Sequence, residues 1–471
     1  MSKEQPRSLY ACRECGAQAF RWEGRCPACG QWNSLDPVPP SQSPAREGSS
    51  WLPSQPGVPQ ELSSVSLEDA PRIELASGEF NRVLGGGLVR GSLVLLGGDP
   101  GIGKSTLLLQ ICSDLASSQL PVLYVSGEES LQQIKLRAER LCIPGHALHV
   151  LAETDLAMVL HHLDILRPGM VVVDSIQSVA LSDMPGGPGT LGQVRECALS
   201  LLRWAKDNGT PTIITGHVTK EGNLAGPRAL EHMVDVVLYL EGDNLGSYRL
   251  LRGEKNRFGS THEVGVFEMR EQGLVEVPNP SQVALASRGR HAVGSAIVPV
   301  MEGTRPVLVE VQALTTPSSL PTPRRVANGV DMGRLLMVTA VLTKRAGVPL
   351  GAQDIIVNVA GGFRATEPAA DLGIALALAS SVRNAPLAEG TAVVGEVGLG
   401  GELRGVGQIP RRMAELGQMG FKGCLVPLTA LQSAEAPPGM EVTGAESLGE
   451  AVSLALPYRA RQRQIDQVPR E

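Results

Sequence analysis

The stretch GGDPGIGKST, residues 97–106, decides the fold of this chain. It follows an apolar run, SLVLLGG at 92–98, and precedes LLLQICSDLA at 107–116, where apolar residues recur at helical spacing. The pattern predicts a buried strand, a glycine-rich turn and the start of a helix. Within it, Gly98, Gly103, Lys104 and Ser105 match the spacing GxxxxGK[ST], which is typical of a phosphate-binding loop.

Such a loop binds ATP because its glycines let backbone N–H groups surround phosphate oxygens at a helix N-terminus. Lys104 is expected to reach the β- and γ-phosphate oxygens, and Ser105 to ligate Mg²⁺. A chance glycine turn is the alternative, and the flanking strand and helix disfavour it. The predicted nucleotide-binding residues of this segment are Gly98, Asp99, Pro100, Gly101, Ile102, Gly103, Lys104, Ser105 and Thr106.

Acidic residues follow two further predicted strands. RPGMVVVDSIQS ends its strand at Asp174, which we expect to hold the hydration shell of Mg²⁺. PVLYVSGEES places Glu128 and Glu129 where a base could orient the attacking water, although either could instead be a first-turn helix carboxylate. Glu128 is preferred because it lies nearer the strand end. TPTIITGHVTK places His217 where it could sense the γ-phosphate or simply lie on the surface.

Length and composition bound the remaining possibilities. A chain of 471 residues is expected to form two or three domains. Only 3% of its residues are aromatic while it has 54 Gly and 34 Pro, which favours α/β units over a β-sandwich. The net charge of −6 means that nucleic-acid binding would rest on local basic patches. Without a predicted membrane span or signal peptide, we expect a cytoplasmic protein with no membrane partner.

Four of the eight cysteines form two CxxC pairs near the N-terminus, Cys12 with Cys15 and Cys26 with Cys29. Four thiolates suit tetrahedral Zn²⁺, and a segment this small needs a metal to fold. Two disulfides or a redox-active pair are the alternatives. The other four cysteines, Cys112, Cys142, Cys197 and Cys424, have no pairing pattern and are expected to be buried thiols.

The segment SGEFNRVLGGGLVRGSLVLLGGDPGIGKSTLLLQ, residues 77–110, resembles the opening of RecA-type ATPase cores. Together with the four-cysteine finger and KNRFG at 255–259, it is similar to the RadA (Sms) family of bacterial DNA repair ATPases. The resemblance implies that Glu128 is the catalytic glutamate and that His217 occupies the γ-phosphate-sensing position. It also implies that Lys255 and Arg257 reach the nucleotide of a neighbouring subunit. From the residues alone, 249–269 reads as two strands around a basic turn, which could equally be a solvated surface.

The sequence from about residue 285 resembles the C-terminal protease domain of Lon. That family has a nucleophilic serine and a lysine base, but this chain carries Asp371 and Pro410 at the matching positions. Neither can perform the Ser-Lys chemistry, and Ser380 and Ser381 lie too far along the helix to replace the serine. The resemblance therefore implies an inactive protease fold that assembles hexameric rings.

Basic residues of this last region could form a track for DNA phosphates, or could be scattered solvated side chains. They are Arg324, Arg325, Arg334, Lys344, Arg345, Arg404, Arg411 and Arg412.

We therefore expect an α/β protein with a RecA-type P-loop core between a zinc finger and a Lon-protease-like α+β domain. The expected limits are 1–32 for the finger, 33–72 for a disordered Pro/Ser-rich linker, 73–284 for the ATPase, 285–456 for the Lon-like domain and 457–471 for a tail. The resemblance implies a DNA-stimulated, hexameric ATPase that moves on single-stranded and branched DNA beside the RecA recombinase, in recombination and the response to DNA damage. The alternatives are an ATPase that regulates protein assemblies without DNA and, less favoured, an ATP-dependent protease.

Overall fold

The computed structural model describes residues 72–118, 120–217, 230–242, 247–285 and 292–456, with 9–12, 18–19, 24, 31–32, 35–38, 61 and 63. The chain forms two compact units, Met1–Pro59 and Gln60–Glu471. No helix in the described ranges is both long and apolar enough to cross a membrane.

The first unit contains a small antiparallel sheet in the order β2-β1-β3. Its strands are β1 (Leu9–Cys12), β2 (Gln18–Ala19) and β3 (Leu35–Val38). Strand β3 falls in the segment predicted to be linker, because it pairs with β1 along four residues. Of the predicted zinc ligands, Cys15, Cys26 and Cys29 lie outside the described residues, and only the backbone of Cys12 is described.

The second unit begins with a nine-stranded sheet. Across the sheet the strands are β12 (Gly273–Glu276), β11 (Val264–Arg270), β10 (Tyr248–Asn256), β9 (Val236–Glu241), β4 (Leu93–Gly98), β8 (Thr212–His217), β7 (Met170–Asp174), β5 (Val122–Ser126) and β6 (Leu148–Ala152). Strands from β9 to β6 are parallel, and β10 to β12 continue the sheet as antiparallel hairpins. The basic turn predicted within 249–269 is therefore confirmed, since it joins β10 to β11.

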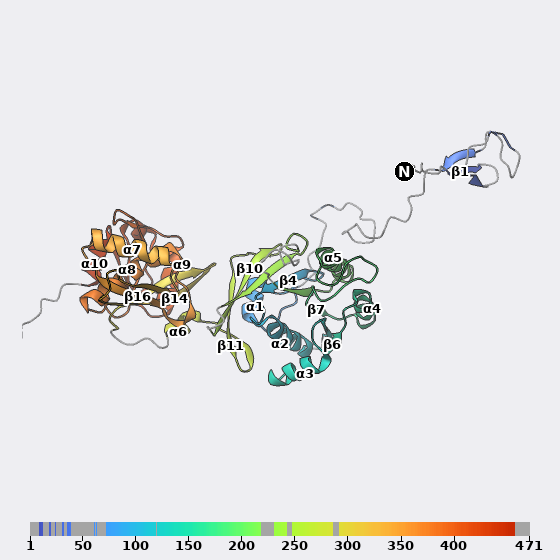
Figure 1. The fold of residues 1–471 in the computed structure, drawn as a ribbon, viewed down its shortest axis with the longest axis horizontal. Helices are drawn as coiled ribbons and strands as arrows, with labels where there is room; N and C mark the ends of the chain where they lie inside the picture. Colours follow the sequence, from blue (N-terminus) through green and yellow to red (C-terminus); the bar gives the residue numbers. More distant parts are fainter. Residues whose placement is uncertain are drawn as a thin grey trace, which may run out of the picture. The chain divides into compact units, whose positions relative to one another are not determined.

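Helices cover both faces of this sheet (Figure 1). On one face lie α1 (Gly78–Leu84), α2 (Lys104–Ser117) and α3 (Leu131–Arg140), and on the other lie α4 (Leu156–Leu166) and α5 (Leu191–Asn208). Successive residues of β4 alternate between the two cores: Val94 packs toward α2, and Leu93 and Leu95 pack toward α5. Burial on both faces explains the continuous apolar run before the glycine loop.

The rest of the second unit is built on a seven-stranded sheet and a small hairpin. The sheet order is β15 (Arg325–Asn328), β16 (Gln353–Val359), β14 (Arg305–Pro317), β13 (Ser295–Glu302), β17 (Thr391–Val393), β20 (Gly423–Pro427) and β21 (Glu441–Ala445), and the hairpin is β18 (Glu396–Val397) with β19 (Leu403–Arg404). The helices are α6 (Pro280–Leu285), α7 (Met332–Arg345), α8 (Asp371–Arg383), α9 (Ile409–Gln418) and α10 (Leu448–Ala455), with 3-10 turns at Ala360–Gly362, Pro368–Ala370 and Leu428–Ser433. This is the α+β arrangement expected from the sequence.

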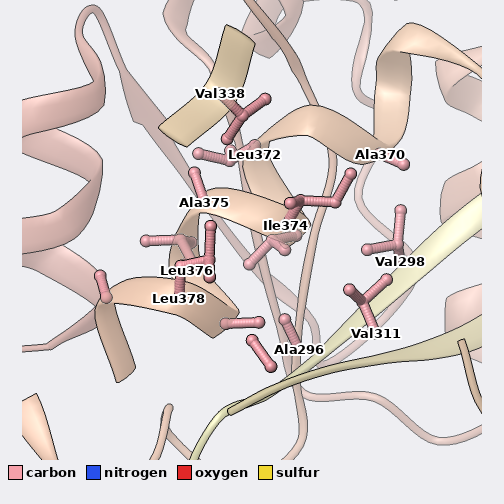
Figure 2. Close-up of a cluster of buried hydrophobic side chains, with 14 of the residues drawn as sticks. Ala296, Val298, Val311, Val338, Ala370, Leu372, Ile374, Ala375, Leu376 and Leu378 are labelled. Atoms are coloured by element: carbon pink, nitrogen blue, oxygen red, sulfur yellow. The ribbon is translucent and has the colours of Figure 1, made fainter. Parts of the chain in front are cut away.

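Helix α8 forms the centre of this domain. Every residue from Asp371 to Ser380 is buried, so the helix packs on all sides rather than along one stripe. Figure 2 shows Leu372, Ile374 and Leu376 among side chains from β13, β14 and α7, including Val298 and Val338. The helix therefore fixes the position of its first residue, Asp371, in the core.

The isolated cysteines follow the prediction with one exception. Cys112, Cys197 and Cys424 are buried, and burial raises the pKa of both Cys197 and Cys424 to about 12, which keeps these thiols protonated. The prediction was wrong for Cys142, which is exposed. It lies two residues after the end of α3 with φ of 56°, and only its own side chain is exposed there, since its neighbours Leu141 and Ile143 are buried.

Candidate nucleotide-binding site

The glycine loop leaves the sheet at the carboxyl end of β4 and enters α2 at Lys104. Two of its glycines are required by geometry. A Cβ at Gly98 would lie 2.6 Å from the carbonyl oxygen of Leu240 on the adjacent strand, and Gly103 has φ of 116°. Any other residue at these two positions would strain or displace the loop, so the backbone path depends on glycine.

The N-terminus of α2 suits an anion. Its N-cap is Gly103, which supplies no side-chain hydrogen bond to the first turn. In contrast, α1, α3 and α4 are capped by Ser77, Ser130 and Asp155. The N-cap of α2 thus supplies no side-chain acceptor to the first turn, and the residues present fit a bound phosphate chain.

Lys104 is the buried cation of the loop, with 4% of its surface exposed. Its Nζ donates to the carbonyl oxygens of Gly98 at 2.7 Å and Asp99 at 3.1 Å. Burial lowers the pKa of Lys104, and nearby carboxylates, Asp174 foremost, oppose that shift. The lysine is therefore held inside the curve of the loop, where the β- and γ-phosphates of ATP would lie.

Asp174 ends β7 beside the loop, as the sequence predicted. Both of its carboxylate oxygens accept hydrogen bonds, Oδ2 from the Tyr124 hydroxyl and Oδ1 from the Thr215 hydroxyl at 2.6 Å. Burial and the neighbouring Asp174 raise the pKa of Tyr124, so this phenol remains a donor. Sequence reasoning missed both partners, because each comes from another strand of the sheet.

The two adjacent glutamates have different partners. Glu128 is exposed at the end of β5 and accepts a hydrogen bond from the Ser175 hydroxyl at 2.5 Å, next to Asp174. Glu129 forms an ion pair with Arg137 of α3. The structure thus brings Glu128 to the edge where Asp174 lies and engages Glu129 with a helix. For His217 the structure describes only the backbone, which ends β8 and lies opposite Gly98 in the register of β4 and β8.

Lys255 and Arg257 lie near the amino ends of the parallel strands, whereas the glycine loop and Asp174 lie at their carboxyl ends. Arg257 contacts Asp235 at 3.3 Å, and the Asp235 carboxylate accepts from the backbone N–H of Leu93, the first residue of β4. Lys255 donates to the carbonyl oxygens of Glu231 at 2.7 Å and Val234 at 2.9 Å. The glycine loop begins at the other end of β4, about 16 Å away at the usual rise per residue. These two cations are therefore remote from the glycine loop of their own chain.

Asp371 and Pro410, at the positions that match the Lon serine and lysine, cannot act as a Ser-Lys pair. Asp371 is fully buried and forms a two-bond ion pair with Arg334 of α7, at 2.9 and 2.7 Å. Pro410 lies in the first turn of α9. Ser380 is buried and bonded to the backbone at Gly294 and Ala385. At the position expected for the Lon serine, the structure therefore has a carboxylate engaged in an ion pair within the domain.

Several cations of the suggested phosphate track have internal roles. Arg334 pairs with Asp371, and Arg412, which is 2% exposed, forms a two-bond ion pair with Glu367. Arg325 donates to backbone carbonyl groups, including that of Leu350. The inclusion of Arg412 in a DNA-facing track was wrong because its side chain is buried, whereas Arg334 and Arg325 are partly exposed and their contact with DNA stays a prediction.

Breaking the Asp371 ion pair should destabilise the C-terminal domain. Arg334→Ala leaves a fully buried carboxylate without its cation, which typically costs about 3–5 kcal/mol. Arg404→Ala is a matched control, because Arg404 and Glu402 form an exposed pair that contributes little. Chemical denaturation of the full chain, followed by far-UV circular dichroism, measures both. Equal stability of the two variants would contradict the structural role of the pair.

The fold and this site define the chain as a P-loop ATPase of the RecA-like type. A family described as AAA domain matches residues 72–223, one described as Rubredoxin metal binding domain matches 10–37, and one described as Subunit ChlI of Mg-chelatase matches 336–430. A KaiC-like protein of known structure from Pyrococcus horikoshii aligns over 44% of this chain and all of its own, with 23% identity and a TM-score of 0.38.

Close relatives extend over nearly the whole chain. A DNA repair protein RadA of Bacillus subtilis is 49% identical over 96% of this chain and 99% of its own length. The RadA proteins of Pseudomonas aeruginosa and Escherichia coli are 47% and 45% identical, over 94% and 95% of this chain and 98% of each relative. The chain belongs to the RadA family of DNA repair proteins, as its motifs indicated. It combines an ATPase core with a rubredoxin-type metal-binding segment and a Lon-like C-terminal domain.

Proposed function

We propose that this chain is an ATP-driven DNA motor that assembles as a hexameric ring on single-stranded and branched DNA. It promotes branch migration of recombination intermediates beside the RecA recombinase. The DNA substrate is inferred from the name DNA repair protein RadA that its relatives carry. ATP hydrolysis is inferred from the P-loop domain.

In this proposal the glycine loop and Lys104 bind the phosphates of ATP. Ser105 and Asp174 would hold Mg²⁺, which would neutralise charge on the phosphates. Glu128 orients the attacking water and accepts its proton. The choice of Glu128 over Glu129 is supported by the contact of Glu129 with Arg137, which directs that carboxylate to α3. His217 remains a proposed γ-phosphate sensor at the end of the neighbouring strand.

The position of Lys255 and Arg257 supports the proposal of a hexameric ring. Both lie beside the amino end of β4, whereas the glycine loop follows its carboxyl end. Cations in that position can serve catalysis only at the nucleotide of another subunit, as an arginine supplied in trans does in other NTPases. A closed ring provides every glycine loop with such a neighbour.

The test of this function is steady-state ATP hydrolysis with and without single-stranded DNA. We expect DNA to raise the rate in the wild type and to have no effect on Lys104→Ala. A hydrolysis rate insensitive to DNA would favour instead an ATPase that regulates protein assemblies. Degradation of an unfolded protein substrate would contradict the assignment of Asp371 and Pro410 to an inactive protease fold.

The N-terminal metal-binding segment should bind one Zn²⁺ per chain through Cys12, Cys15, Cys26 and Cys29. Cys26→Ser is expected to abolish metal retention because one of four thiolates is lost. The ATPase core should stay folded, since it belongs to a separate compact unit. Metal analysis of freshly purified, reduced protein measures the stoichiometry, with Cys142→Ser as a control. Absence of zinc from the wild type would contradict the assignment.

Removing the Lon-like domain should abolish hexamers. We place the truncation after residue 278, because α6 packs on the C-terminal domain: its Ser281 hydroxyl bonds Glu415 at 2.5 Å and accepts from Leu308 N–H at 3.0 Å. The shortened chain is expected to bind a fluorescent ATP analogue but to hydrolyse ATP poorly, since no neighbour completes its site. Mass photometry and ATPase rates on the same samples measure both effects. Full-rate hydrolysis by a hexameric truncated core would contradict the assembly role.

A further inference from the structure

The turn of the β13–β14 hairpin, residues 302–305, contacts the ATPase domain at several points. The Arg305 guanidinium bonds the buried Glu79 carboxylate of α1 at 2.7 Å. Glu302 forms an ion pair with Arg252 of β10. These four residues, here called the hairpin tip, are thus fixed to two separate elements of the ATPase domain.

The hairpin tip also holds the loop that carries Arg257. We call residues 257–263, between β10 and β11, the cation loop. The backbone N–H of Thr304 donates to the carbonyl of His262 at 2.8 Å, and its hydroxyl donates to Glu263 Oε1 at 2.6 Å. Gly303 has φ of 64°, and a Cβ there would lie 1.8 Å from the His262 carbonyl oxygen. Only glycine permits this approach.

The other end of the cation loop is anchored within the ATPase domain. The Arg257 N–H donates to the carbonyl of Asp235 at 3.2 Å, and the Phe258 carbonyl accepts from Arg72 at 2.6 Å. The loop therefore has one anchor on the ATPase core and one on the Lon-like domain. Within the Lon-like domain, Arg411 of α9 donates to the carbonyl of Thr304 at 3.1 Å. This bond connects the hairpin tip to the rest of that domain.

From these contacts we infer that the hairpin tip is a positioning element, through which the Lon-like domain orients Arg257 for hydrolysis in a neighbouring subunit. The inference rests on the proposed role of Arg257 in trans. It adds that Gly303 and Thr304 control the position of that arginine. The loop joins β10 to β11, and contacts near Arg257 alone would leave its remaining residues able to change conformation and shift this exposed side chain. A second anchor restricts them, and catalysis depends on such restriction.

Variants of the full chain test the hairpin tip. Thr304→Val removes one hydrogen bond without changing shape, so kcat should fall about threefold to tenfold with KM for ATP unchanged. Thr304→Ser keeps the hydroxyl and should restore the rate. Gly303→Ala forces the tip from His262, and kcat should fall at least about tenfold. Thr316→Val, at an exposed position of the adjoining strand β14, is the control and should match the wild type. A wild-type kcat for both Thr304→Val and Gly303→Ala would overturn the inference.

Mixed assemblies separate positioning from loss of structure. Subunits with Gly303→Ala have an intact glycine loop, and subunits with Lys104→Ala have an intact tip. A random equal mixture, prepared by co-expression, should reach about a quarter of the wild-type rate, because that share of neighbouring pairs combines both intact parts. Gly303→Ala subunits that gain nothing from the mixture would contradict positioning in trans.

The same mixture made with Arg257→Ala in place of Gly303→Ala tests the underlying function. Activity regained by Arg257→Ala supports catalysis in trans, and its absence would overturn the proposed role of Arg257 itself. Recovery with Arg257→Ala but not with Gly303→Ala would retain the proposed function and overturn only the inference about the hairpin tip. Mass photometry of each sample ensures that assemblies of equal size are compared.

Discussion

Lys104→Ala should reduce ATP hydrolysis by about 10³-fold, since it removes a charge that stabilises the transferred phosphoryl group inside a preorganised loop. Nucleotide binding should weaken as well, because the lysine is proposed to contact the phosphates in the ground state. The buried position of its ammonium group, bonded to two loop carbonyl groups, accounts for an effect of this size. Steady-state hydrolysis and titration with a fluorescent ATP analogue measure the two losses separately.

The matched control for this variant is Lys135→Ala. Lys135 forms an exposed ion pair with Glu139 on α3 and should have no influence on hydrolysis. If Lys104→Ala hydrolysed ATP at the rate of Lys135→Ala, the glycine loop would not be the catalytic phosphate site.

Glu128→Gln should hydrolyse ATP about 10²- to 10⁴-fold more slowly while binding it normally, because the substitution removes only the base that orients water. The amide keeps the size of the side chain and its contact with the Ser175 hydroxyl, so the loop should be preserved. Single-turnover hydrolysis and an equilibrium binding assay distinguish the chemical step from binding.

Glu129→Gln provides the comparison within the same loop. Since Glu129 pairs with Arg137, its substitution should leave the chemical step nearly unchanged. A larger loss in Glu129→Gln than in Glu128→Gln would transfer the role of base to Glu129.

Local sequence rules sufficed for the elements that hold the nucleotide site. The apolar run 92–98, the glycine spacing and the helical pattern after Lys104 specify strand, loop and helix, because each depends on residues close together in the chain. The carboxylate at the end of a parallel strand predicted the place of Asp174 for the same reason. In contrast, the hydroxyl groups of Tyr124 and Thr215 that bond Asp174 come from strands 50 and 41 residues away in sequence. No local pattern indicates such pairs.

The sequence by itself determined the class of protein and the glycine loop, and it put Asp371 and Pro410 where the resemblance to Lon expects the serine and lysine, since these follow from residue types and their spacing. Tertiary structure alone decided which charged side chains remain accessible. Arg334 and Arg412 read as surface cations in the sequence, yet each is bound to a carboxylate from a distant segment, because a charge within a core requires a counter-ion. Tertiary structure also placed Arg257 far from its own glycine loop, and it brought the far end of the loop that carries Arg257 against the hairpin tip. Both positions arise from the strand order of the sheet and the packing of two domains, which are long-range properties of the chain.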